Sequence, residues 1–173
     1  MTATPPDLLP NATGTWTLDP TATTIQLRTK AMWVLPVKAT FTATEGSGTV
    51  TPDGQVSGSF VVNAASIDTG NAGRDKHLLT RDFFEVETYP TFTYAATSVV
   101  PAADGTFAVT GSLTIHGKTR PLDLVAKVAP HGADTVTVST EAALDRSQWD
   151  IDWTKMGANL HNQISVTAAF LKA

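Results

Sequence analysis

The sequence contains no cysteine, so no disulfide can form in this chain of 173 residues. Charge is also sparse: charged residues make up 16% of the chain, and the formal net charge is −4. Proteins that bind nucleic acid use a basic stripe to displace counterions from phosphates. This sequence contains no such stripe, so we exclude nucleic acid as a partner. The four histidines show no metal-binding spacing, and no glycine-rich phosphate loop follows a strand. We therefore expect neither a metal nor a cofactor.

Long apolar runs are missing as well. No stretch approaches the roughly 20 apolar residues of a membrane-spanning helix, so we expect no stable membrane insertion. The first residues, Met1-Thr2-Ala3-Thr4-Pro5, lack the basic start and apolar segment of a secretory signal, and we expect a cytoplasmic location. We interpret residues 1–13 as a flexible tail and residues 14–173 as a single domain.

What the sequence does contain is an alternation of apolar and polar residues. Between Thr106 and His116 the odd positions are apolar, apart from Gly111, and most even positions carry hydroxyl groups. This period of two is typical of a strand with one buried face. Seven further runs show it, at residues 24–28, 37–43, 56–64, 91–97, 122–128, 136–144 and 163–170.

Short turn signals separate these runs, including Pro52-Asp53-Gly54 and Ala103-Asp104-Gly105. Connections this short join antiparallel neighbours. About eight one-sided strands must hide their apolar faces from water, and a sheet that closes on itself does so while removing its edges. We therefore predict an all-β, eight-stranded antiparallel barrel, with a two-sheet sandwich as the alternative.

The stretch between residues 69 and 86 interrupts the alternation. Leu79, Phe83 and Val86 follow a helical spacing, and Asn71 is a suitable N-cap. We expect one or two short helices across one end of the barrel.

The predicted inner face is rich in small residues. An eight-stranded barrel either fills its interior with side chains or holds one small ligand, and small inward residues favour a cavity. The alternative is that they allow close packing where the barrel tapers. The set comprises Ala39, Ala43, Gly58, Ala64, Ala96, Gly111, Ala126, Ala142 and Ala168.

Several motifs are shared with a known family. They are Ser-Ile-Asp-Thr-Gly at residues 66–70, Arg-Asp-Lys-His-Leu at 74–78, Asp-Phe-Phe-Glu-Val at 82–86 and Val-Thr-Gly-Ser-Leu-Thr-Ile-His-Gly-Lys at 109–118. In this order they resemble the YceI-like family. The resemblance implies an extended, lipocalin-like barrel that holds a polyisoprenoid chain in its interior and that can form a homodimer. The chain departs from the family pattern at Lys30-Ala31, at Ala39 and at Trp149-Asp150.

These observations predict a carrier for a long-chain apolar or amphiphilic ligand, an isoprenoid of polyprenyl or quinone type, rather than an enzyme. One alternative is a small hydrolase or isomerase that uses His77 with Asp75 or a nearby serine. Another is an interaction module with a filled barrel. Aromatic residues and the polar side chains of the crossing segment are the candidate ligand contacts. They are Trp33, Leu35, Phe41, Arg74, His77, Phe83, Phe84, Tyr94, Trp149, Trp153 and Met156.

Overall fold

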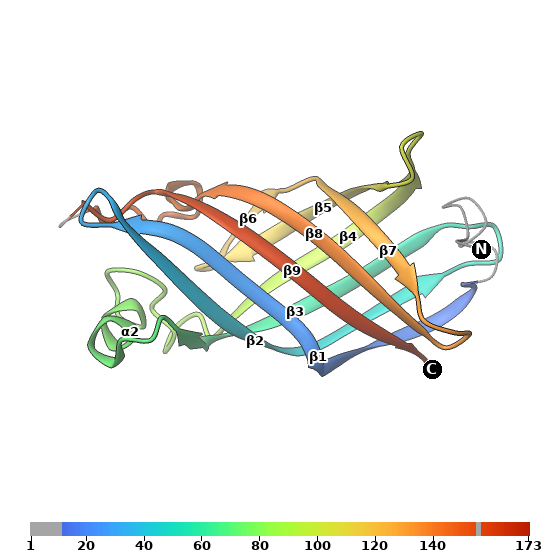
Figure 1. The fold of residues 1–173 in the computed structure, drawn as a ribbon, viewed down its shortest axis with the longest axis horizontal. Helices are drawn as coiled ribbons and strands as arrows, with labels where there is room; N and C mark the ends of the chain where they lie inside the picture. The colour runs from blue at the N-terminus through green and yellow to red at the C-terminus, as the bar shows by residue number, and fades with distance from the viewer. Residues whose placement is uncertain (1–11, 155–156) are drawn as a thin grey trace.

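The computed structural model describes residues 12–154 and 157–173. Its main feature is one antiparallel sheet that closes on itself (Figure 1). The strands are β1 Gly14–Ala31, β2 Leu35–Val50, β3 Val56–Asp68, β4 Thr91–Pro101, β5 Phe107–Ile115, β6 Lys118–Pro121, β7 Leu124–Pro130, β8 Thr135–Asp145 and β9 His161–Lys172. Around the ring they follow the order β4-β3-β2-β1-β9-β8-β7-β5, and pairing between β4 and β5 completes the circle.

The ring has eight members because β6 and β7 act as one interrupted strand. Both pair with β5, β6 along residues 112–115 and β7 along residues 107–109. Between them, the backbone N–H of Leu122 donates to the carbonyl of Gly111. The predicted eight-stranded antiparallel barrel is confirmed, and the two-sheet alternative is wrong because the sheet is continuous.

Alternation along each strand decides which side chains enter the barrel. On β2, Val37, Ala39, Phe41 and Ala43 are buried, whereas the polar residues between them are exposed. A strand places successive side chains on opposite faces, so a single register directs every apolar residue of the run inward. The inner faces of β1, β2, β3, β4 and β9 form a shared apolar cluster, and Leu78, Leu79, Phe84 and Val86 pack against it at one end of the barrel.

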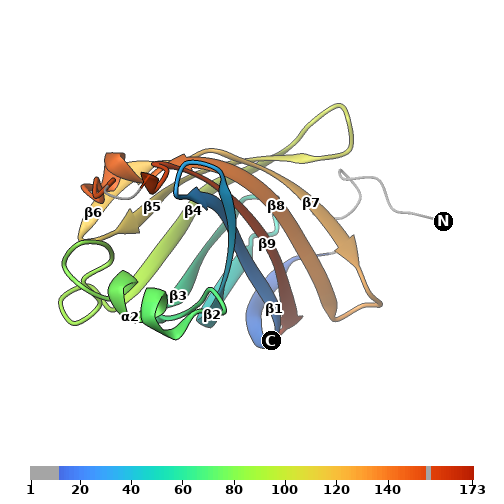
Figure 2. The same cartoon turned by 60° about the vertical axis from the view of Figure 1, so that its left-hand side comes forward.

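That end is covered by the helix α2 (Ala72–Leu78), a short 3₁₀ helix (Arg146–Trp149) and the loops around them (Figure 2). Asn71 is the N-cap of α2, and its side chain accepts a hydrogen bond from the backbone N–H of Arg74. A second α-helix over residues 79–86 does not form. Those residues make tight turns, and Glu85 has a positive φ of 47° that interrupts a helix. The spacing of Leu79 and Val86 instead reflects their packing against the apolar cluster.

Helices are few and short in the described residues, and none has the length and apolar character needed to cross a membrane.

Candidate ligand-binding cavity

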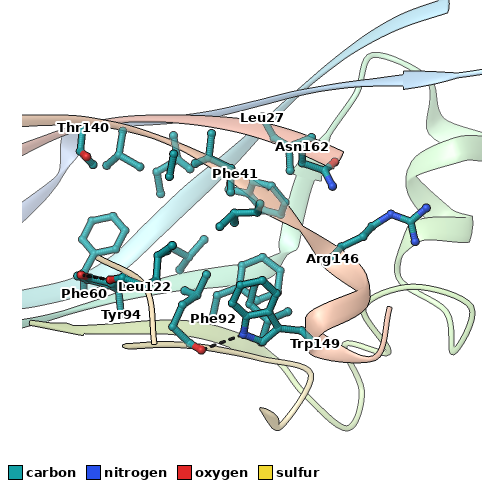
Figure 3. Close-up of a pocket in the computed structure, with 18 of the residues that line it drawn as sticks. Leu27, Phe41, Phe60, Phe92, Tyr94, Leu122, Thr140, Arg146, Trp149 and Asn162 are labelled. Atoms are coloured by element: carbon teal, nitrogen blue, oxygen red, sulfur yellow. Dashed lines mark hydrogen bonds between the residues drawn. The ribbon is translucent and has the colours of Figure 1, made fainter. Parts of the chain in front are cut away.

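The barrel interior contains two open chambers. The narrow chamber, about 140 Å³, lies toward the end covered by α2 and the 3₁₀ helix, and its wall includes Phe41, Phe92 and Trp149 (Figure 3). The wide chamber, about 640 Å³, lies toward the opposite end, where residues 132–134 of the β7–β8 turn reach its rim.

The two chambers meet at a waist inside the barrel. Five residues line both of them: Phe60, Tyr94, Leu124, Thr140 and Val166. These residues come from strands on different sides of the ring, so the waist is a level of the barrel rather than one wall. The interior therefore holds two adjacent spaces along the barrel, and the smaller one lies near the covered end.

The small inward residues fall into two groups. Gly58, Ala96, Ala126 and Ala168 line the wide chamber, and Ala142 lines the narrow one. Gly58 also allows the backbone of β2 to approach closely, because a side chain there would meet Ser47 O at 2.6 Å. Neighbouring atoms take up the space at the remaining positions. Ala39, Ala43 and Ala64 belong to the packed apolar cluster, and a side chain at Gly111 would approach the Tyr94 hydroxyl to 2.5 Å. Ala96, Ala126 and Ala168 thus leave room in the wide chamber, whereas Ala39, Ala43 and Ala64 allow aromatic rings to pack.

Polar groups in the wall of the narrow chamber and at the waist already donate to backbone carbonyls. The Tyr94 hydroxyl donates to Leu122 O at 2.7 Å, and the Trp149 indole N–H donates to Leu113 O at 2.9 Å (Figure 3). Thr140 Oγ1 donates to Val125 O at 2.9 Å. Burial, with a contribution from the charge of Asp123, raises the pKa of Tyr94 to about 12, so its hydroxyl stays neutral. The surface presented to a ligand here is mainly hydrocarbon.

Arg146 touches the narrow chamber, but its guanidinium points away from it (Figure 3). The guanidinium donates to the carbonyl oxygens of Ile151 at 2.7 Å, Trp153 at 2.6 Å and Asn159 at 3.1 Å, with a longer contact of 3.4 Å to Ala158. Burial lowers the pKa of Arg146. This side chain holds residues 151–153 and 158–159 over the end of the barrel. Neither residue composition nor the alternation of apolar residues indicated this role for Arg146.

The structure separates the predicted site residues by position. Phe41, Phe84, Tyr94 and Trp149 line the narrow chamber. Met156 lies outside the described residues. Trp33 and Leu35 lie at the β1–β2 turn, where they are 76% and 46% exposed, and they line neither chamber.

His77, Phe83 and Trp153 form a separate cluster outside the chambers. The His77 ring lies 4.8 Å from that of Trp153 and 5.4 Å from that of Phe83. Its Nε2 atom is 2.8 Å from Asp82 Oδ2, in a pair that is partly exposed to solvent. Across the described residues, no three His, Asp or Glu side chains gather to hold a metal.

Arg74 and Asp75 hold the start of α2 against Thr69, the residue that follows β3. Arg74 Nε donates to Thr69 Oγ1 at 2.8 Å, and Asp75 Oδ1 accepts from the backbone N–H of Thr69 at 2.9 Å. Neither residue lines a chamber within the described part of the chain. The wall residues that were not singled out as candidates, such as Leu27, Leu113 and Val138, belong to the inward positions of the alternation. That alternation was the signal that could have identified them.

A closed, eight-stranded barrel with an open apolar interior defines a hydrophobic ligand-binding barrel of the lipocalin type. The sequence profile of the YceI-like domain matches residues 16–170. The chain belongs to the YceI-like family.

Curated relatives share part of this sequence. A UPF0312 protein of Ectopseudomonas mendocina is 42% identical over 76 residues, which is 44% of this chain and 40% of that protein. Protein YceI of Escherichia coli strain UMN026 is 42% identical over 73 residues, or 42% of this chain and 38% of its own length. The matched segments therefore span about two fifths of these relatives.

Two solved structures share the fold. BcnA of Burkholderia cenocepacia superposes with a TM-score of 0.76 at 23% identity, covering 88% of this chain and 98% of BcnA. A polyisoprenoid-binding domain from Saccharophagus degradans, described as implicated in plant cell wall breakdown, gives a TM-score of 0.72 at 16% identity. That match covers 91% of this chain and 98% of the domain. At these identities the likeness establishes the fold alone.

Proposed function

We propose that this protein is a carrier for a long-chain apolar or amphiphilic ligand, an isoprenoid of polyprenyl or quinone type, held along the barrel interior. The observation that carries the proposal is the pair of chambers that share a waist. An elongated apolar space suits a flexible hydrocarbon chain better than a compact polar metabolite. The name of the Saccharophagus degradans domain, which shares the fold, points to the same ligand class.

Affinity in such a site comes mainly from removing hydrocarbon from water, at about 25 cal/mol per Å² of buried apolar surface. The ordering of a flexible chain and the loss of free motion oppose this gain. The hydroxyl groups of Tyr94 and Thr140 at the waist do not require a hydrogen bond to the ligand, because both already donate to backbone carbonyls. Selectivity should therefore follow chain length and width more than head-group chemistry.

The arrangement of the chambers favours one orientation of an amphiphile. The apolar tail fits the narrow chamber, and the polar end fits the wide chamber, whose rim includes the charged residues Asp134 and Lys172. Water at the rim can solvate a head group that the hydrocarbon wall of the narrow chamber would desolvate.

The two alternative functions find less support. The His77–Asp82 pair is the only acidic contact described for His77, and it lies outside both chambers, so it does not face a bound substrate there. An interaction module with a filled barrel is disfavoured by the open interior. The cytoplasmic location and the homodimer stay predictions.

Ligand extraction tests the proposal directly. Protein purified without denaturant is extracted with organic solvent, and the extract is analysed by mass spectrometry. We expect a stoichiometric long-chain species, and we expect stripped protein to bind added geranylgeraniol or an isoprenoid quinone. A protein that is empty after purification and ignores both compounds would contradict the proposal.

A pair of alanine variants on β7 provides the matched control. Ala126 lines the wide chamber, whereas Ala129 is exposed on the outer face of the same strand. We expect Ala126→Trp to reduce the amount of bound lipid and Ala129→Trp to leave it unchanged. Equal lipid content in the two folded variants would place the ligand outside the barrel.

A further inference from the structure

The turn between β1 and β2 carries an exposed apolar tip, defined here as residues 32–35. Met32, Trp33, Val34 and Leu35 are 55%, 76%, 79% and 46% exposed. They form most of the large hydrophobic side chains that the described structure exposes to this degree. Isolated exposed apolar residues are ordinary, but a contiguous group at one projecting turn indicates a contact surface.

The backbone conformation of this tip is one that large apolar residues rarely adopt. Met32 and Trp33 have positive φ angles of 48° and 66°. Tight turns with such angles favour Gly, Asn or Asp, because bulky side chains are strained there. Local folding preference therefore does not explain these residues, and sites that break local rules are often functional.

Cations lie directly behind the tip on the outer face of the same hairpin. Arg28 and Lys38 are register partners on β1 and β2, and Lys30 is one step closer to the tip. All three are exposed, and the ion pairs found among the described residues include none of them. Like charges placed opposite one another destabilise a sheet slightly. This small basic patch also stands out in a chain whose net charge is −4.

We propose that the tip docks on a lipid bilayer, with its apolar side chains in the interfacial layer and the three cations against lipid phosphates. Tryptophan favours the membrane–water interface, and lysine and arginine can keep their charge at the phosphate level while their stems lie on apolar groups. The tip is formed by a single hairpin turn at one end of the barrel (Figure 1), so a fluid surface can close around it. Docking through this tip is peripheral and needs no spanning segment.

The tip also connects to the covered end of the barrel. The backbone N–H of Trp33 donates to Gly157 O at 3.2 Å, and that of Asn159 donates to Lys30 O at 2.9 Å. A docked barrel would hold its narrow chamber toward the bilayer and its wide rim toward water. This order matches that of an amphiphile in the membrane. The docking surface rests on the tip and its cations, whereas this link to ligand transfer rests on the proposed function.

Vesicle co-sedimentation of the full chain tests the proposal. The probes are vesicles of phosphatidylcholine alone and vesicles that also contain phosphatidylglycerol. We expect Trp33→Ser to lower binding to the mixed vesicles by at least about tenfold, because an interfacial side chain is lost. Arg28→Gln and Lys38→Gln should each lower binding to the mixed vesicles by about fivefold and have little effect on phosphatidylcholine alone.

The matched controls are Val125→Ser and Lys127→Gln, which alter exposed outward residues of β7 away from the tip. Both should bind like the wild type, and thermal melts should show that all variants are folded. Wild-type protein that ignores the mixed vesicles, or a Trp33→Ser variant that binds them fully, would overturn the proposal. The proposal would also be overturned if the tip only joins two copies of the chain. In that case the wild type would form a dimer and bind no vesicles, and Trp33→Ser would be a monomer. Lipid that still copurifies with Trp33→Ser would separate docking from ligand binding.

Discussion

The waist between the two chambers offers a direct test of whether one ligand occupies both. Val166 lines the waist on β9, where its register partners are Ile25 on β1 and Thr140 on β8. Replacing Val166 with Phe adds a ring at the level where the chambers meet. The ring would divide the interior and leave the wide chamber open on its own side.

The expected loss of affinity follows from the hydrocarbon that can no longer enter. Burying one methylene contributes about 0.8 kcal/mol, so excluding a five-carbon isoprene unit from the narrow chamber removes about 4 kcal/mol of transfer free energy. Part of this loss is offset because the excluded segment is no longer ordered. We therefore expect affinity for a long chain to fall by roughly tenfold to a thousandfold. The added ring itself costs up to about 3 kcal/mol of stability, and less where it enters open space.

Isothermal titration with geraniol, farnesol and geranylgeraniol measures the effect as a function of chain length. Wild-type affinity should rise with each added unit, whereas that of Val166→Phe should stop rising at a shorter chain. Val125→Phe is the control, because Val125 is 61% exposed on the outer face of β7. If folded Val166→Phe binds geranylgeraniol as tightly as the control, the ligand does not pass the waist.

Three further predictions concern the end cover, α2 and the interior. Arg146→Met should lower the free energy of unfolding by about 2–4 kcal/mol, because buried carbonyls lose their donors. Hydrogen exchange should then be faster in residues 150–154 and 157–160, and unchanged exchange would argue against this role of Arg146. Asn71→Ala should cost about 1 kcal/mol in urea unfolding through loss of the cap, and Asn71→Asp should retain most of it. The pKa of Tyr94 is raised from 10.0 to about 12, so the unfolded chain loses this proton first. Stability should therefore fall between about pH 10 and pH 12, and the absence of any difference from Tyr94→Phe in alkaline melts would contradict this.

The barrel was predictable because alternation is a property of the strand backbone. Once the run from Phe107 to Ile115 is a strand, its odd residues must share one face. In the structure, the residues of that face are buried or line a chamber. The stretch between residues 69 and 86, which interrupts the alternation, was less predictable. Apolar residues at helical spacing can also arise from turns packed on a core, and the positive φ of Glu85 leaves no mark in the hydrophobic pattern.

The same distinction explains the candidate site. Phe41 and Tyr94 lie on strands, whose register fixes the direction of each side chain, and both line the narrow chamber. Trp33, Phe83 and Trp153 lie in turns or loops, where no period relates position in the sequence to direction. Their size suggested a pocket wall, but the structure places them outside the chambers. The proposed ligand class owes more to the family resemblance than to any single residue.

Because β1 pairs with β9, the barrel cannot close until the last strand has been synthesised. Trp16 pairs with Lys172, so the seam of the barrel joins the first and last strands of the domain. Contacts so distant in sequence form slowly, because a long loop must close before they stabilise anything. During translation the apolar inner faces stay open until β9 has been made. The protein can therefore enclose a ligand only after its last strand is in place, and removal of β9 would leave an open sheet with two exposed edges rather than a smaller barrel.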